Sequence, residues 1–149
     1  MILSYVQKKN VPLVTLGKKC MKYGGYKPFS KENDLQGLFY APFVTFIQKE
    51  FGLKGQVVSL LSSEDIVSAL DRGNLVIVSV NPLIRNTDLK PPAKGGHLVL
   101  VIGYDIKKST LTYHNPSGDT RTSQEAVQIS FKDFKRFFAY RGIIVHLEK

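Results

Sequence analysis

The second half of the chain carries apolar runs whose pattern is typical of buried strands. Leu75–Val80 is a β-branched run, as expected for a central strand covered on both faces. Leu98–Tyr104 and Thr110–His114 follow, and the polar segment Asp105–Ser109 between them is typical of a hairpin turn. Together with Gly142–Leu147, these runs predict an antiparallel sheet.

Helices are predicted before and between these strands. Helical spacing of apolar residues, with capping residues or glycines at the ends, predicts helices over Met1–Val6, Leu13–Tyr23, Ala41–Phe51, Ile66–Arg72 and a segment after the cap Ser130–Asp133. One helical face is expected to be buried in the second of these, formed by Leu13, Leu16, Cys20 and Tyr23. The last helix is expected to point three aromatic rings inward, those of Phe134, Phe137 and Phe138.

The order of these elements is typical of an α+β fold, with N-terminal helices packed on an antiparallel β-sheet. A chain of 149 residues suits one domain, and we expect a single domain over residues 1–149. Gln56–Leu60 is predicted as a short strand and Lys27–Gly37 as a polar connection. Asn81–Lys94 contains several prolines and is predicted as a long loop, which in a small domain often borders a functional site.

The charge of the chain is strongly positive and unevenly distributed. The net charge is +9, and a group of lysines precedes the first acidic residue, Glu32: Lys8, Lys9, Lys18, Lys19, Lys22, Lys27 and Lys31. Such a segment can attract nucleic acid, anionic lipid or an acidic protein. Because it lacks an arginine and aromatic platform, we favour a solvated basic face over a nucleic-acid site. Nucleic-acid binding stays a third hypothesis, and it predicts an affinity that falls steeply with salt.

Cysteine, histidine and hydropathy patterns exclude several classes of protein. Cys20 is the single cysteine, so an internal disulfide is excluded, and the dispersed histidines lack the spacing of a zinc site. We therefore expect no cofactor and no metal. No run approaches the roughly 20 apolar residues of a membrane span, and the N-terminus lacks the pattern of a signal peptide. As written, the product is expected in the cytoplasm, and nothing indicates its oligomeric state.

A histidine and an asparagine are predicted to meet at one end of the sheet. His97 opens a strand after Gly95-Gly96, and Asn115-Pro116 closes the next strand. Taken alone, such a histidine often caps a loop and Asn-Pro often opens a turn. On neighbouring strands, however, the imidazole and the carboxamide can lie side by side, as the base and its orienting residue do in sites with a cysteine nucleophile.

We expect the remaining two histidines to have structural roles. Strand alternation directs the His114 side chain to the face opposite Asn115, so we expect it to be exposed or hydrogen-bonded. His146 is expected at the surface.

These motifs resemble the C39-like family of papain-like cysteine peptidases, which are related to the domains that cleave double-glycine leaders from bacteriocin precursors. The specific part of the resemblance is Gly96-His97, followed by Gly103-Tyr104-Asp105 and Asn115-Pro116, while Gly73–Val80 and the helices are compatible with it. The resemblance covers nearly the whole chain. It implies a papain-like fold, thiol-dependent peptide hydrolysis and a peptide or protein substrate, and free-standing relatives are often exported.

The resemblance also assigns roles to particular residues. His97 matches the base and Asn115 the residue that orients it, since a carboxamide oxygen can accept the imidazole N–H. In the family the nucleophilic cysteine, preceded by an oxyanion-hole glutamine, stands near the start of the first long helix. Ile2–Val6 matches the end of that helix, so the resemblance places both residues before Met1.

Three explanations of this pattern are left open. The sequence is a truncated copy or fragment, or it is a pseudoenzyme that keeps the fold, or Cys20 has become the nucleophile. A cysteine on an apolar helical face is more often an inert core residue than a thiolate. We therefore expect little or no peptidase activity. The alternative function is a non-catalytic peptide-binding module, with a groove between helices and sheet that accepts an extended segment.

Overall fold

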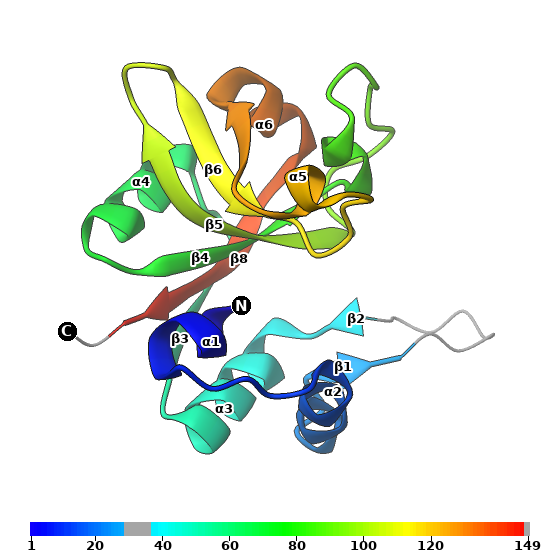
Figure 1. Cartoon of the computed structure of the whole chain (residues 1–149), viewed down its shortest axis with the longest axis vertical. Coiled ribbons are helices and arrows are strands. Elements are labelled where there is room, and N and C mark those ends of the chain that lie inside the picture. The colour runs from blue at the N-terminus through cyan, green and yellow to red at the C-terminus, as the bar shows by residue number, and fades with distance from the viewer. Residues whose placement is uncertain (29–36, 148–149) are drawn as a thin grey trace. The chain divides into compact units, whose positions relative to one another are not determined.

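The computed structural model describes residues 1–28 and 37–147, which combine helices with antiparallel strands (Figure 1). The chain forms two compact units, the first from Met1–Gly55 with the C-terminal residues from Leu147, the second from Gln56–His146. The predicted α+β class is confirmed. The single domain over residues 1–149 stays a prediction.

Aromatic side chains of one helix, α3 (Tyr40–Phe51), form the centre of the first unit. Its elements are α1 (Ile2–Gln7), α2 (Leu13–Lys22), β1 (Tyr26–Lys27), β2 (Gly37–Leu38) and α3 (Tyr40–Phe51). On α3, Phe46 is buried, and its ring lies 5.7 Å from that of Tyr23 and 5.5 Å from that of Phe51. The predicted helices Met1–Val6, Leu13–Tyr23 and Ala41–Phe51 are confirmed with small shifts of their ends.

The structure differs from the expected burial of α2 at one residue. Leu13 was expected on a buried face but is 83% exposed. Packing against α2 occurs around Cys20 and Tyr23, and Leu13 lies about 10 Å earlier along the helix axis, since each residue rises about 1.5 Å. The middle of the predicted connection Lys27–Gly37 lies outside the described residues, and its ends belong to the paired strands β1 and β2.

The second unit carries the main sheet. Its first strand, β3 (Lys54–Val58), begins at the end of the first unit. The other elements in chain order are α4 (Ser63–Asp71), β4 (Leu75–Val80), η1 (Pro82–Arg85), β5 (His97–Asp105), β6 (Thr110–His114), α5 (Arg121–Gln124), β7 (Val127–Ser130), α6 (Phe131–Phe137) and β8 (Phe138–His146). The sheet has six strands in the order β3-β8-β4-β5-β6-β7, and β4, predicted as a central strand, is paired antiparallel on both sides.

Alternation along the strands explains the core of this unit. Val76, Val78 and Val80 point to one face of β4, where α4 and α6 pack. The predicted inward position of three rings is confirmed, because Phe134, Phe137 and Phe138 are all fully buried. Phe138, however, is not helical: the helix ends at Phe137, and Phe138 opens β8 and pairs with Val80.

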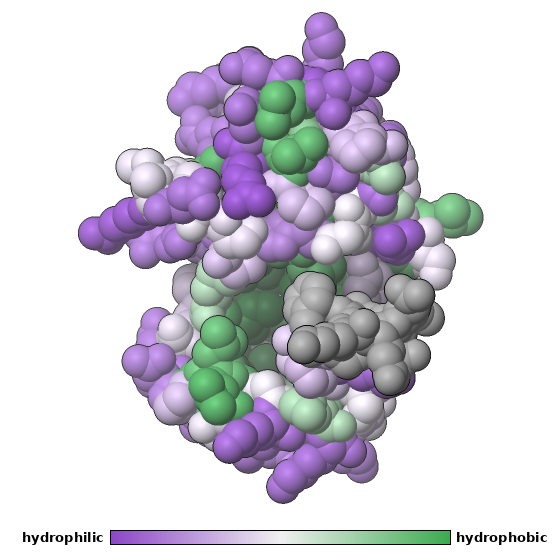
Figure 2. Space-filling model, turned by 90° about the vertical axis from the view of Figure 1, so that its right-hand side faces the viewer, coloured by the Kyte–Doolittle hydropathy of each residue, from purple (hydrophilic) through white to green (hydrophobic). Residues whose placement is uncertain are grey.

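The face of the protein drawn in Figure 2 is mostly hydrophilic. Figure 2 shows polar and charged side chains over most of the visible face, with small apolar areas between them. The lysines predicted as a basic face are exposed wherever the structure describes them. Within residues 1–28 and 37–147, no helix has the length and apolar character needed to cross a membrane.

Asn81 forms hydrogen bonds with several segments that lie near the start of β5. Its Oδ1 accepts the backbone N–H of Leu83 at 2.9 Å, and its Nδ2 donates to the carbonyl of Ala93 at 2.7 Å. Its own N–H donates to the carbonyl of Phe137. One buried side chain therefore holds η1 and the end of the long loop before His97.

We expect Asn81→Ala to lower the free energy of unfolding by about 2 kcal/mol, because two hydrogen bonds of a buried side chain are lost together. Urea denaturation followed by circular dichroism measures the change. Asn86→Ala is the matched control, since Asn86 is exposed and its side-chain oxygen accepts the N–H of Asp88. It should cost less than about 0.5 kcal/mol. Equal losses in the two variants would contradict the role given to Asn81.

Candidate active site

Strand register brings His97 and Asn115 to the same end of the sheet. His97 opens β5 opposite Val80, and β6 ends at His114, which pairs with Leu100. Continued pairing would set Asn115 opposite Val99, two residues from His97 on the same face, and such diagonal neighbours are within reach of long side chains. Gly95 and Gly96, with φ of 89° and 96°, make the turn into β5 in a conformation that other residues rarely adopt.

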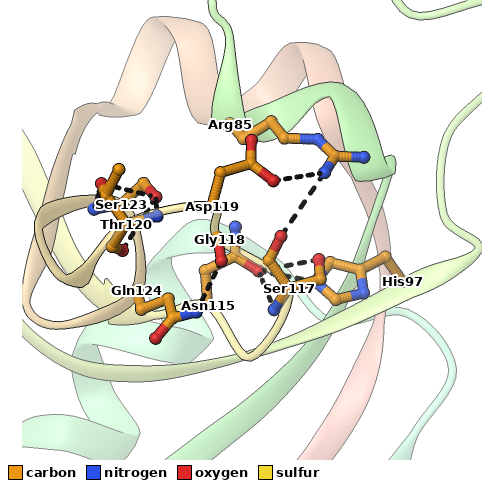
Figure 3. A network of polar contacts seen from close by, with 9 residues as sticks. All are labelled: Arg85, His97, Asn115, Ser117, Gly118, Asp119, Thr120, Ser123 and Gln124. Carbon is orange, nitrogen blue, oxygen red and sulfur yellow. Dashed lines mark hydrogen bonds and ion pairs between the residues drawn. The ribbon is translucent and has the colours of Figure 1, made fainter.

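Three donors converge on one oxygen of Asn115 (Figure 3). His97 Nε2 lies 2.7 Å from Asn115 Oδ1, the backbone N–H of Ser117 donates to it at 3.1 Å, and the Ser117 hydroxyl donates at 3.3 Å. A backbone N–H can only donate, so the atom facing it must be the carboxamide oxygen rather than the nitrogen. The main chain thereby fixes which end of the Asn115 amide faces His97.

This oxygen determines which nitrogen of His97 carries the proton. A contact of 2.7 Å between Nε2 and an acceptor oxygen requires a proton on Nε2. In the neutral ring Nδ1 then keeps its lone pair and can accept a proton. Ser117 Oγ also lies 3.1 Å from Nε2, so it accepts a share of the same N–H. Geometrically, His97 is arranged as a base that acts through Nδ1.

The turn after Asn115 is held from two sides. The backbone N–H of Asn115 donates to the carbonyl of Gln124 at 2.8 Å, and the side chain of Gln124 donates to the carbonyl of Gly118. From η1, Arg85 reaches the carbonyl of Ser117 at 3.4 Å and the carboxylate of Asp119 at 3.6 Å. Figure 3 shows these residues around the turn. Its conformation therefore depends on contacts with both α5 and η1.

Asn115 is buried although it is polar. Its side chain is 1% exposed, and Nδ2 has no hydrogen-bond partner among the described residues. An unpaired buried N–H group costs free energy, so the oxygen contacts must outweigh this cost in the orientation observed. The hydrogen bonds of the amide oxygen therefore determine the orientation of the Asn115 side chain.

The other histidines lie elsewhere. His114 Nδ1 accepts the backbone N–H of Ala126 at 3.2 Å, which confirms that this ring is hydrogen-bonded. His146, near the C-terminal end of β8, is half-buried, so its predicted surface position is only partly right.

Cys20 belongs to the first compact unit, whereas His97 and Asn115 belong to the second. It lies on α2, is 4% exposed, and its Sγ sits 2.7 Å from the point where a Cβ on Gly25 would be. Burial raises the pKa of its thiol above the ordinary value of 9.0. Its predicted burial is confirmed, and a buried, protonated thiol is a poor nucleophile.

Metal ligation is not indicated in the part of the chain that the structure describes. No group of three or more His, Cys, Asp or Glu side chains lies close enough there to hold a metal ion.

Sequence reasoning found the pair but missed the residues that support it. Ser117 could have been found, because an asparagine oxygen often accepts the N–H two residues on in an Asx turn. Arg85 could not, since it lies on the short 3₁₀ helix η1, in a segment with no periodic pattern, and its contacts depend on how that segment folds.

Comparisons with known proteins agree on a family and a fold. Over residues 1–143 the sequence matches the model of the Peptidase_C39 like family. Among solved structures, the chain is similar to a candidate C39-like peptidase from Bacillus anthracis, with a TM-score of 0.55 and 15% identity. The similarity covers 81% of this chain but 65% of that one, just under two thirds. At this identity it concerns the fold alone, and it supports the predicted papain-like architecture. None of the curated proteins matches the sequence.

Gly118→Ala is expected to disturb the Asn115 turn, because a Cβ there would lie 2.3 Å from the carbonyl oxygen of Ser123. We expect a loss of about 1–3 kcal/mol in the free energy of unfolding, with weakening of the His97 Nε2–H signal in proton NMR. Gly103→Ala is the control, since its Cβ would meet nothing within 4 Å. An intact His97 signal in Gly118→Ala would show that the turn does not hold the pair.

Proposed function

Because the chain belongs to the C39-like peptidase family, we propose that it carries the base and the orienting residue of a cysteine-peptidase site. The observation that carries this proposal is the 2.7 Å contact between His97 Nε2 and Asn115 Oδ1, with the oxygen fixed by the N–H of Ser117. In this arrangement Nδ1 of His97 is the basic nitrogen. A peptide or protein is the proposed substrate class.

The chemistry proposed for such a site is acyl transfer through a thiolate. Nδ1 takes the proton of a cysteine thiol, and the thiolate attacks the scissile carbonyl carbon. The imidazolium returns this proton to the leaving amine nitrogen as the C–N bond breaks, which leaves a thioester. Water, deprotonated by the same nitrogen, then hydrolyses the thioester and releases the thiol. Asn115 holds the ring and its tautomer throughout.

For the 149-residue chain itself we propose little or no peptide hydrolysis. Its single thiol is Cys20, and burial both limits access to it and raises its pKa. Near pH 7 such a group is almost entirely protonated, whereas the nucleophile in this chemistry is the thiolate. The proposal that Cys20 serves as the nucleophile is therefore the weaker one.

Labelling with iodoacetamide from pH 5 to pH 10 tests Cys20. Because the pKa is raised above 9.0, the thiolate fraction should rise about tenfold per pH unit up to about pH 8, with no plateau below pH 9. Mass spectrometry should show slow labelling of the folded chain and fast labelling after unfolding. The His97→Ala variant should give the same profile, with His114→Ala as the control for loss of an imidazole.

Fast labelling near pH 6 that disappears in His97→Ala but not in His114→Ala would overturn this expectation. Cys20 would then be an activated nucleophile, and the chain an active peptidase.

A non-catalytic peptide-binding module is the second proposed function. Two observations favour it: Cys20 is buried, and the His97–Asn115 pair is complete. In this case the second unit binds an extended peptide without cleaving it. The two functions share the site and differ in the fate of the peptide.

A peptide that ends in Gly-Gly chloromethyl ketone distinguishes these outcomes. Nδ1 of His97, with its free lone pair, should attack the chloromethyl carbon, forming a C–N bond as chloride leaves. Peptide mapping should therefore find the adduct on His97, and a scrambled peptide should give at least about tenfold less. An adduct on Cys20 would support the active enzyme. No adduct on either residue would contradict a peptide site at His97.

A further inference from the structure

We propose that Ser117 is a positioning residue that selects the tautomer of His97 in which Nδ1 is basic. The inference rests on the proposed function, because only a base acting through Nδ1 makes this selection useful. Ser117 is not given contact with the substrate. It acts through Asn115 and His97, which its backbone and hydroxyl groups both reach.

An asparagine in this place presents an ambiguity that a carboxylate does not. The two ends of a carboxamide have nearly the same shape, but one accepts hydrogen bonds and the other donates them. If the amide of Asn115 rotated by half a turn, Nδ2 would face His97 Nε2. Nε2 would then have to accept, and the ring proton would move to Nδ1. A ring protonated there has lost the lone pair that the proposed chemistry uses.

Ser117 opposes this rotation with two groups of its own. Its N–H and its O–H both donate to Asn115 Oδ1, at 3.1 Å and 3.3 Å. In the rotated amide the N–H would face another donor and could not turn away. Its hydroxyl also lies 3.1 Å from Nε2, where it accepts from the protonated form. Each of these contacts favours the same amide orientation and the same tautomer.

Two further observations support this selection. Asn115 Nδ2 is buried without a partner among the described residues, so the orientation observed is kept although the nitrogen is unsatisfied. In addition, Arg85 holds the carbonyl of Ser117 at 3.4 Å, which limits movement of the turn. The oxygen contacts therefore decide the orientation.

Selection of one amide orientation by Ser117 differs from a general stabilising role in one measurable consequence. An aspartate at position 115 would present oxygen at both ends, so its rotation would change nothing for Nε2. Ser117 should then affect the tautomer much more with Asn115 than in the Asn115→Asp variant, where only its direct contact with His97 Nε2 remains. A hydroxyl that merely stabilised the turn would matter equally in both.

Nitrogen NMR of the full chain, labelled with ¹⁵N-histidine and held at a pH where the ring is neutral, measures the tautomer of His97 directly. In Ser117→Ala the ratio of Nε2–H to Nδ1–H forms should fall about fivefold, the size of effect expected from one ordinary hydrogen bond. Ser117→Thr, which keeps the hydroxyl, should restore the ratio. In the Asn115→Asp background, Ser117→Ala should change it less than about twofold.

Ser123→Ala is the matched control, because Ser123 is the N3 residue of the α5 capping box and its hydroxyl bonds to the N-cap Thr120. It should leave the tautomer ratio unchanged. An unchanged ratio in Ser117→Ala, or an equal fall in the Asn115→Asp background, would overturn the inference. The NMR measurement needs no peptide and no thiol, so it is independent of the test with the peptide chloromethyl ketone. If the tautomer ratio falls as expected in Ser117→Ala but no adduct forms on His97, the proposed function is rejected and the selection by Ser117 is retained.

Discussion

The oxygen of Asn115 is the point on which the candidate site depends. It accepts from an imidazole, a backbone amide and a hydroxyl, and the backbone amide is the contact that cannot adapt. A hydroxyl group can rotate to follow the imidazole ring, whereas a main-chain N–H has a fixed direction and so orients both the Asn115 amide and the His97 ring. Which nitrogen of His97 is basic is therefore decided by the local path of the chain. The chemistry of the site is in this sense a property of the turn.

The sheet supplies the rigid frame on which this turn is placed. β4 lies between β5 and β8, and Val80 pairs with His97 on one side and Phe138 on the other. Its apolar face is covered by α4 and α6. Close packing of this kind leaves little freedom for the strand that carries His97. Asn81 extends the constraint into the loop before β5 through its contact with Ala93.

Features with a strong period could be predicted from the sequence, and features set by loop geometry could not. The strands of the β5–β6 hairpin and the helix α3 have clear apolar patterns, and the nearness of His97 and Asn115 followed from the strands. The short elements α5 and β7 have only a few residues each, too few for a period to show. The contact between the Arg85 side chain and the Ser117 carbonyl depends on the rotamer of Arg85 and on the path of the turn after Asn115, which no spacing rule predicts.

The His97–Asn115 pair is also local in the chain, with its members 18 positions apart and connected by a single hairpin. Closing so short a loop costs little chain entropy, so the pair can assemble as soon as β5 and β6 do. In hydrogen exchange the amides of Asn115 and Ser117 should then open in the same event as the hairpin. The base and its orienting residue would then belong to one cooperative unit that folds and unfolds together with β5 and β6.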